Sequence, residues 1–154
     1  ELVKKANKQK PSAIIIGCFD DTGLKQAREI SLCPVLGIGE SSFLLSYLFS
    51  GETAVITTVH EAVPIIKKNI KNAGYSTLIS EVIAADVEVL DLEFSPAQSA
   101  VKFAQASKAL NGSTQNIILG CAGAVKIKDE FETITGYKSF DGVTSAAKLC
   151  RALL

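Results

Sequence analysis

Two stretches of this chain, far apart in the sequence, share one pattern: an apolar run that ends in a glycine and a cysteine. The first stretch runs from Ile14 to Cys18, and the second runs from Ile117 to Cys121. Short, continuously apolar runs of this kind are typical of strands that are buried on both faces. We therefore predict two fully buried strands, each of which places a cysteine at its carboxyl end.

Strand patterns alternate with helix patterns over the rest of the chain. Further strands are predicted at 35–38 and 53–59, each followed by a helix. For the next strand, residues 87–92 are the better candidate and residues 77–84 are the weaker one. The clearest amphipathic helix pattern is the last, from Val143 to Leu154. This alternation predicts an α/β fold with mainly parallel sheets flanked by helices, in which ligands bind at the carboxyl ends of the strands.

The charge balance and the lack of long apolar segments limit the kinds of partner. The chain carries 16 Lys and Arg residues against 16 Asp and Glu residues, so we expect no nucleic-acid partner. No apolar run approaches the roughly 20 residues that span a bilayer, and the opening residues lack the apolar region of a signal peptide. We expect a soluble, cytoplasmic protein with no membrane partner.

The spacing of the four cysteines argues against a metal site. Cys18, Cys33, Cys121 and Cys150 show none of the close Cys-x-x-Cys pairing that zinc and thioredoxin-type sites use. A disulfide framework is not expected in a chain this apolar without a secretion signal. Cys33, next to Pro34, and Cys150, on the apolar face of the last helix, are interpreted as structural.

Cys18 and Cys121 are candidates for chemistry because each is predicted between a strand and the amino terminus of a helix. The helix dipole and the free backbone N–H groups there stabilise a thiolate. One thiolate could remove a proton from a substrate carbon while a thiol on the opposite face supplies a proton. Such a pair would invert the carbon without a metal or pyridoxal cofactor, and the chain has no recognisable site for either.

Three other polar features have simpler interpretations. Asp20 and Asp21 precede the helix pattern at 23–31 and are predicted to cap that helix. His60, the only histidine, is expected to cap an element or to lie at the surface. The segment 37–42 resembles the start of a dinucleotide-binding loop, but Ser42 replaces its third glycine and a cofactor is not expected there.

Six short motifs along the chain occur in the order found in one known enzyme family. Together they cover nearly the whole chain: Gly-Cys-Phe-Asp-Asp-Thr-Gly-Leu at 17–24, Pro-Val-Leu-Gly-Ile-Gly-Glu at 34–40, Val-Ile-Thr-Thr at 55–58, Val-Leu-Asp-Leu-Glu at 89–93, Gly-Cys-Ala-Gly at 120–123 and Asp-Gly-Val at 141–143. This set resembles the hydantoin and allantoin racemase branch of the Asp/Glu racemase superfamily. The resemblance implies two similar α/β domains with the site in the cleft between them. Residues 1–49 and 137–154 would form the first domain, and residues 50–136 the second.

The resemblance also implies roles for individual residues. Cys18 and Cys121 match the two catalytic cysteines of the family. A strand end and the backbone next to the cysteines match the family's substrate-binding positions, which are Phe19, Thr57, Thr58, Ala122 and Gly123. The two threonines would meet the substrate, and the backbone around the other three would hold the ring carbonyls. The resemblance further implies a homo-oligomer.

Two departures from the superfamily patterns bear on the substrate and on the first domain. Amino-acid racemases follow the first cysteine with Asn-Thr, whereas Cys18 is followed by Phe-Asp-Asp-Thr. This difference favours a small cyclic ureide, either a 5-substituted hydantoin or allantoin. Family members also begin with a strand that carries an Asn-Pro-Asn-Thr-like loop, and nothing in this sequence matches it. We therefore expect the amino-terminal part of the first domain to be missing.

Three functions remain open on this reasoning. The first is a cofactor-independent racemase of a hydantoin or allantoin, with a two-cysteine, two-base mechanism. The second is a non-catalytic small-molecule-binding relative, for instance a regulator in nitrogen metabolism. The third is an amino-acid racemase, or an isomerase or decarboxylase of a small dicarboxylate, which would require cationic groups in the cleft. The presence of both cysteines favours the first, and the lack of arginine in the six motifs argues against the third.

Overall fold

The computed structural model describes residues 1–153 and contains two parallel β-sheets flanked by helices. Leu154, the last residue of the predicted closing helix, lies outside the described residues. The strands are β1 (Ile14–Ile16) and β2 (Val35–Gly37) in the smaller sheet, and β3 (Glu52–Thr57), β4 (Ile79–Ala84), β5 (Thr114–Gly120) and β6 (Lys138–Asp141) in the larger sheet. The helices are α1 (Leu2–Lys8), α2 (Leu24–Ile30), α3 (Ile38–Ser46), α4 (Ala62–Ala73), α5 (Asp91–Phe94), α6 (Pro96–Ser107), the 3₁₀ helix η1 (Ala122–Lys126), α7 (Lys128–Thr135) and α8 (Gly142–Leu153). The predicted α/β fold with parallel sheets is confirmed.

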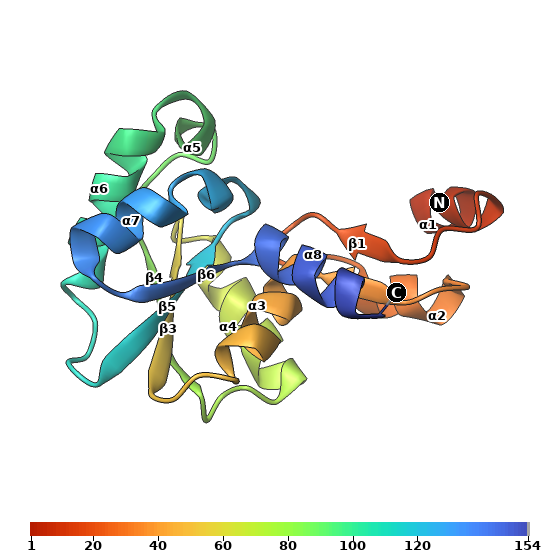
Figure 1. The fold of residues 1–154 in the computed structure, drawn as a ribbon, viewed down its shortest axis with the longest axis horizontal. Coiled ribbons are helices and arrows are strands. Elements are labelled where there is room, and N and C mark those ends of the chain that lie inside the picture. Colours follow the sequence, from red (N-terminus) through yellow and green to blue (C-terminus); the bar gives the residue numbers. More distant parts are fainter. Residues whose placement is uncertain (154) are drawn as a thin grey trace.

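The larger sheet, in the order β4-β3-β5-β6, is covered on both faces. Figure 1 shows α6 and α7 on one side of it and α3 and α4 on the other. Successive residues of a strand point to opposite faces. On β5, Ile117 and Leu119 therefore pack with the α6 and α7 side, whereas Ile118 packs with Phe43 of α3. All three isoleucine and leucine side chains are fully buried, as the continuous apolar run predicts for a central parallel strand.

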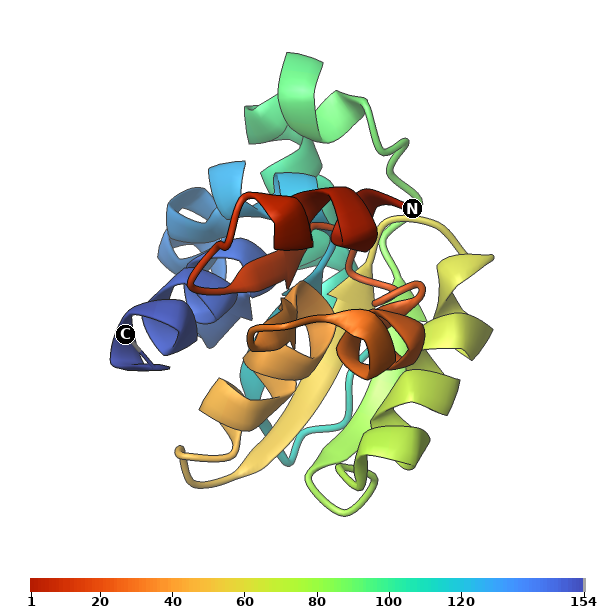
Figure 2. The ribbon, with the colours of Figure 1, turned by 90° about the vertical axis from the view of Figure 1, so that its right-hand side faces the viewer.

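The prediction of a fully buried first strand is wrong in part. Ile15 in the middle of β1 is 42% exposed. The reason is the small sheet: among the described residues β1 pairs only with β2. The cluster beneath it is also small, with Leu24, Ala27 and Val35 as its buried members. Figure 2 looks onto this end of the molecule, with α1 in front of the small sheet.

The choice between the two candidates for the fourth strand was also wrong. The strand β4 lies at 79–84, and residues 87–90 form a connection that leads into α5. Val87 in this connection and Leu92 in α5 are buried, whereas Val89 and Leu90 are exposed. The backbone N–H of Val87 donates to the Thr58 carbonyl. The apolar pattern that resembles a strand arises because two side chains of this segment, Val87 and Leu92, are buried although the segment pairs with no strand within residues 1–153.

The last strand and helix connect the two sheets. β6 hydrogen-bonds to β5 in the larger sheet, although we expected the segment from residue 137 onward to return to the first domain. α8 then packs against α3 and reaches β2 (Figure 1). At their junction, a Cβ on Gly142 would lie 2.7 Å from the Ile38 carbonyl oxygen, so glycine permits this close approach. The division into two domains stays a prediction.

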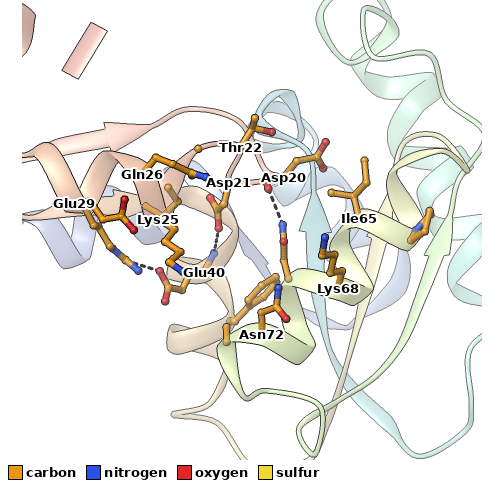
Figure 3. Close-up of a pocket in the computed structure, with 17 residues that line it drawn as sticks. Asp20, Asp21, Thr22, Lys25, Gln26, Glu29, Glu40, Ile65, Lys68 and Asn72 are labelled. Carbon is orange, nitrogen blue, oxygen red and sulfur yellow. Dashed lines mark hydrogen bonds and ion pairs between the residues drawn. The ribbon is translucent and has the colours of Figure 1, made fainter. Parts of the chain in front are cut away.

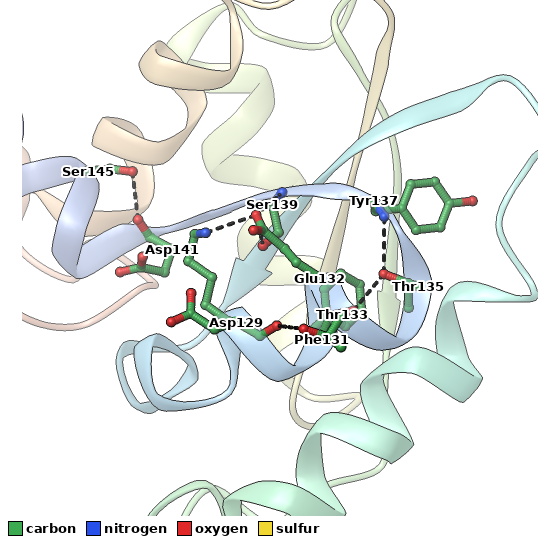
Figure 4. Close-up of polar contacts among 10 residues, drawn as sticks. Asp129, Phe131, Glu132, Thr133, Thr135, Tyr137, Ser139, Asp141 and Ser145 are labelled. Carbon is green, nitrogen blue, oxygen red and sulfur yellow. Dashed lines mark hydrogen bonds and ion pairs between the residues drawn. The ribbon is translucent and has the colours of Figure 1, made fainter.

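Polar contacts fix β6 against α7, as Figure 4 shows. The Glu132 carboxylate accepts hydrogen bonds from Lys128 Nζ at 2.9 Å, from the Ser139 N–H at 2.8 Å and from Ser139 Oγ at 3.0 Å. At the end of β6, Asp141 accepts a 2.7 Å bond from the Thr144 N–H and so caps α8.

Within residues 1–153, no helix has the length and apolar character needed to cross a membrane.

Candidate active site

Cys18 and Cys121 each follow the carboxyl end of a parallel strand, one from each sheet. Both are free thiols; Cys18 is exposed and Cys121 is half-buried. The residues that follow them, Phe19 and Ala122, belong to the same hydrophobic cluster. The negative charge of Cys18 also acts on the pKa of Cys121. Two residues 103 positions apart, as their numbers show, are thus directed toward a common region.

Burial raises the pKa of the Cys121 thiol above its ordinary value. The backbone N–H groups of Gly123 and Ala122 donate toward its sulfur and lower the pKa, whereas the charges of Cys18 and Asp20 raise it. The net pKa is raised. The N–H groups expected at a helix start are therefore present, but burial outweighs their effect. The thiol form of Cys121 is accordingly favoured at neutral pH.

Thr57 and Thr58 lie at the end of β3, directly beside the end of β5. Thr57 is fully buried, and its hydroxyl donates a 2.9 Å hydrogen bond to the Gly120 carbonyl. Gly120 immediately precedes Cys121, so this bond fixes the strand end that carries the thiol. The Thr58 side chain is also buried. The Thr57 hydroxyl is thus hydrogen-bonded to Gly120 and links the ends of β3 and β5.

The other three predicted substrate-binding residues lie next to the two cysteines in the sequence. The Phe19 ring is 4% exposed and packs edge-on against Phe43, with ring centroids 6.0 Å apart. Ala122 and Gly123 are the first residues of η1. A Cβ on Gly123 would lie 3.1 Å from the Leu92 side chain, so glycine allows η1 to pack closely on that buried residue.

The turn that carries Cys18 borders an open cavity of about 1080 Å³ (Figure 3). Its walls come from this turn and from α2, α3 and α4, with Asp20, Asp21, Glu40 and Lys68 among the lining residues. Neither cysteine is among them, so the cavity adjoins the candidate site.

Over residues 1–153, no three side chains of the types that bind metals gather closely enough to hold an ion.

Sequence reasoning missed two contacts that hold the Cys18 turn. Asp21 was predicted to cap α2, but its carboxylate accepts N–H groups at the start of α3. Asn69 on α4 donates to the Asp20 carbonyl. Neither contact has a local signal, because the partners are 18 or more residues apart. His60 lies at the surface, as predicted, beside Asp86.

Comparison with known proteins places this chain in a family. A family model described as Asp/Glu/Hydantoin racemase matches residues 1–150. The chain belongs to this family. Within it, a hydantoin racemase of Rhizobium meliloti is 36% identical over 155 residues, which cover 99% of this chain and 64% of that protein.

Solved structures of racemases share the fold. An allantoin racemase from Klebsiella pneumoniae matches with a TM-score of 0.89 at 25% identity, over 99% of this chain and 63% of that one. An allantoin racemase from Pseudomonas fluorescens matches with a TM-score of 0.86 at 28% identity, over 92% and 61%. The chain thus spans less than two thirds of the length of these relatives.

Proposed function

We propose that the protein is a cofactor-independent racemase that inverts the ring stereocentre of a 5-substituted hydantoin or of allantoin. Cys18 and Cys121 are its two acid-base groups. The observation that carries the proposal is their placement: two free thiols at the carboxyl ends of strands from two sheets, close enough for one charge to act on the other. Membership of the Asp/Glu/hydantoin racemase family supports it.

The proposed reaction is a proton exchange across the ring carbon. One cysteine, as thiolate, takes the proton from the stereocentre, and the bonding electron pair moves to the adjacent ring carbonyl to form an enolate. The other cysteine, as thiol, donates a proton to the opposite face while the carbonyl re-forms. The two cysteines end with exchanged protonation states, which solvent restores. No oxidant, metal or pyridoxal group takes part.

The surroundings of Cys121 assign the starting roles. Because burial raises its pKa, Cys121 rests as a thiol at neutral pH and serves first as the proton donor, with Cys18 as the base. In the reverse direction Cys121 must begin as the thiolate, and the N–H groups of Ala122 and Gly123 stabilise that thiolate. The backbone around Phe19, Ala122 and Gly123 also binds the ring carbonyls of the substrate in this proposal, and the site lies in the cleft between the two domains.

Solvent exchange tests the proposal directly. The purified full-length protein is incubated in D₂O with each enantiomer of a 5-substituted hydantoin and of allantoin, and optical rotation is followed together with deuterium uptake at the ring carbon. We expect rotation to be lost as deuterium enters. Cys18→Ser and Cys121→Ser should each lower inversion by at least roughly 100-fold, in line with the loss of an acid-base group.

The chain supplies its own matched controls. Cys33→Ser, between α2 and β2, and Cys150→Ser, in α8, make the same chemical change outside the strand ends that carry Cys18 and Cys121. Each should leave the rate within about twofold. Full activity in Cys18→Ser or Cys121→Ser would refute the two-base mechanism. Tight binding of a ureide with no exchange of its ring proton would instead favour the non-catalytic binding protein.

A further inference from the structure

Asp21 connects the turn that carries Cys18 to helix α3. Its carboxylate accepts a 3.1 Å hydrogen bond from the Gly39 N–H and a 2.7 Å bond from the Glu40 N–H. These N–H groups belong to the first turn of α3, where backbone donors lack partners within the helix. Figure 3 shows the Asp21 side chain directed toward this helix start. One carboxylate thus satisfies two helix N–H groups and ties the turn to α3.

The backbone of Asp21 closes the turn itself. Its N–H donates to the Cys18 carbonyl at 3.0 Å, and its carbonyl accepts the Leu24 N–H at 3.0 Å. Its φ is +49°, a left-handed conformation that aspartate adopts more readily than most other residues. The main chain and the side chain of Asp21 are therefore both hydrogen-bonded in the turn that follows Cys18.

The glycines at 37 and 39 make room for this carboxylate. A Cβ on Gly37 would overlap the Asp21 carboxylate, and a Cβ on Gly39 would lie 2.8 Å from Asp21 Oδ2 and would overlap the Phe19 carbonyl. The Gly-Ile-Gly segment, which resembles part of a dinucleotide loop, thus forms a cradle for the turn after Cys18. This explains a motif for which the proposed reaction has no other use.

A second helix holds the turn from the other side. Asn69 of α4 donates a 2.6 Å hydrogen bond from Nδ2 to the Asp20 carbonyl. Asp20 and Asp21 are consecutive, so α4 and α3 form hydrogen bonds with adjacent residues of the turn. Because α4 packs on the larger sheet, where Cys121 also originates, this bond relates the Cys18 turn to the sheet that carries the second thiol.

We propose that Asp21 is a positioning residue for Cys18: through the N–H groups of Gly39 and Glu40 it holds the thiol in register with Cys121. The expected effect on the rate of inversion rests on the proposed function. The expected effect on the position of Cys18 relative to Cys121 does not. The cost of misplacement is large, since a shift of about 1 Å in a reacting group can lower a rate by roughly 100-fold.

The variant that tests this is Asp21→Asn in the full-length protein. Asparagine keeps the shape but has one acceptor oxygen, and its NH₂ group would face a backbone N–H that needs an acceptor. We expect kcat for inversion to fall roughly 10- to 100-fold with KM changed less than about threefold. Glu29→Gln is the matched control: it removes one carboxylate charge from the same cavity wall and should leave both constants unchanged.

Exchange of the substrate proton separates positioning from general damage. If only Cys18 is misplaced, Cys121 can still remove the proton on its own face, exchange it with solvent and return a deuteron to the same face. Asp21→Asn should therefore keep deuterium exchange on one enantiomer, with retention, and lose most of it on the other. Equal loss on both enantiomers, or inversion within threefold of the parent protein, would overturn the proposal. Circular dichroism and thermal unfolding verify that the variant is folded.

A chemical readout keeps this inference distinct from the proposed function. Dibromobimane, which bridges two neighbouring thiols, is added to the parent protein, Asp21→Asn and Glu29→Gln, and the Cys18–Cys121 product is measured by peptide mass spectrometry. We expect bridging to fall at least fivefold in Asp21→Asn alone. Bridging that depends on Asp21 in a protein without racemase activity would uphold positioning and refute the function. Equal bridging in the parent protein and in Asp21→Asn, in a protein that is an active racemase, would refute positioning and uphold the function.

Discussion

Two threonines on one strand allow the energetics of the candidate site to be tested by changes of opposite sign. Thr57 and Thr53 both lie on β3 and are both fully buried. The Thr57 hydroxyl donates a 2.9 Å bond to the Gly120 carbonyl. The Thr53 hydroxyl has no hydrogen-bond partner among residues 1–153. Replacing each by valine exchanges a hydroxyl for a methyl group of similar size, so packing changes little.

The expected magnitudes follow from these two environments. Thr57→Val removes a buried bond and should lower the free energy of unfolding by about 1–3 kcal/mol. For a chain of this size, that corresponds to a Tm roughly 2–10 °C lower. Thr53→Val removes a hydroxyl that is buried without a partner and should raise the free energy of unfolding by about 1 kcal/mol. The two variants should thus differ by about 2–4 kcal/mol.

Urea unfolding of the full-length protein measures both values, with an unchanged m value as the check that only stability has moved. Racemase assays add a second comparison. Because the Thr57 bond holds the residue before Cys121, Thr57→Val should also slow inversion, whereas Thr53→Val should not. A destabilised Thr53→Val, or a Thr57→Val as stable as the parent, would refute this account of the two hydroxyls.

Two further predictions concern ionisation. Burial raises the pKa of Cys121, and the charge of Cys18 raises it further, so alkylation of Cys121 by iodoacetamide should begin at a higher pH than for a free thiol. Cys18→Ser should move that profile to lower pH by a few tenths of a unit or more, and an unmoved profile would contradict the coupling. Partial burial raises the pKa of Glu132, but bonds from Lys128 and Ser139 lower it by more, to below its ordinary 4.5. The stability this carboxylate contributes is therefore present above pH 4.5 and lost as the pH falls through its folded pKa; Glu132→Gln should cost about 1 kcal/mol at pH 7 and flatten the acid limb of a stability profile, which urea unfolding at several pH values would show.

The predictions from sequence succeeded where a local pattern and the tertiary structure impose the same demand. The run from Ile117 to Leu119 is continuously apolar, and β5 is buried on both faces, so the pattern and the environment agree. The same reasoning failed for Ile15, whose neighbours match those of Ile118 in type, because β1 lies in a small sheet. It also failed for residues 87–92, where the buried side chains of Val87 and Leu92 give an apolar pattern like that of a strand.

Capping shows the same limit at the scale of one side chain. Asp21 directly precedes α2 in the sequence and is a good capping residue, so a local reading predicts that it caps α2. In the fold, α2 begins at Leu24 with Gly23 at its N-cap and no side-chain cap, and Asp21 caps α3. The choice depends on the approach of α3 to the turn, which Gly37 and Gly39 permit.

The sequence by itself determined the class of fold, the alternation of strands and helices outside 77–92, and the two cysteines at strand ends, because each of these depends on residues within a few positions of one another. The tertiary structure alone decided which edge β6 joins, that burial raises the pKa of Cys121, and that Asp21 and Asn69 hold the turn of Cys18. These properties depend on groups brought together from distant segments. Their energies come from desolvation and hydrogen bonding across the fold, which no short stretch of sequence contains.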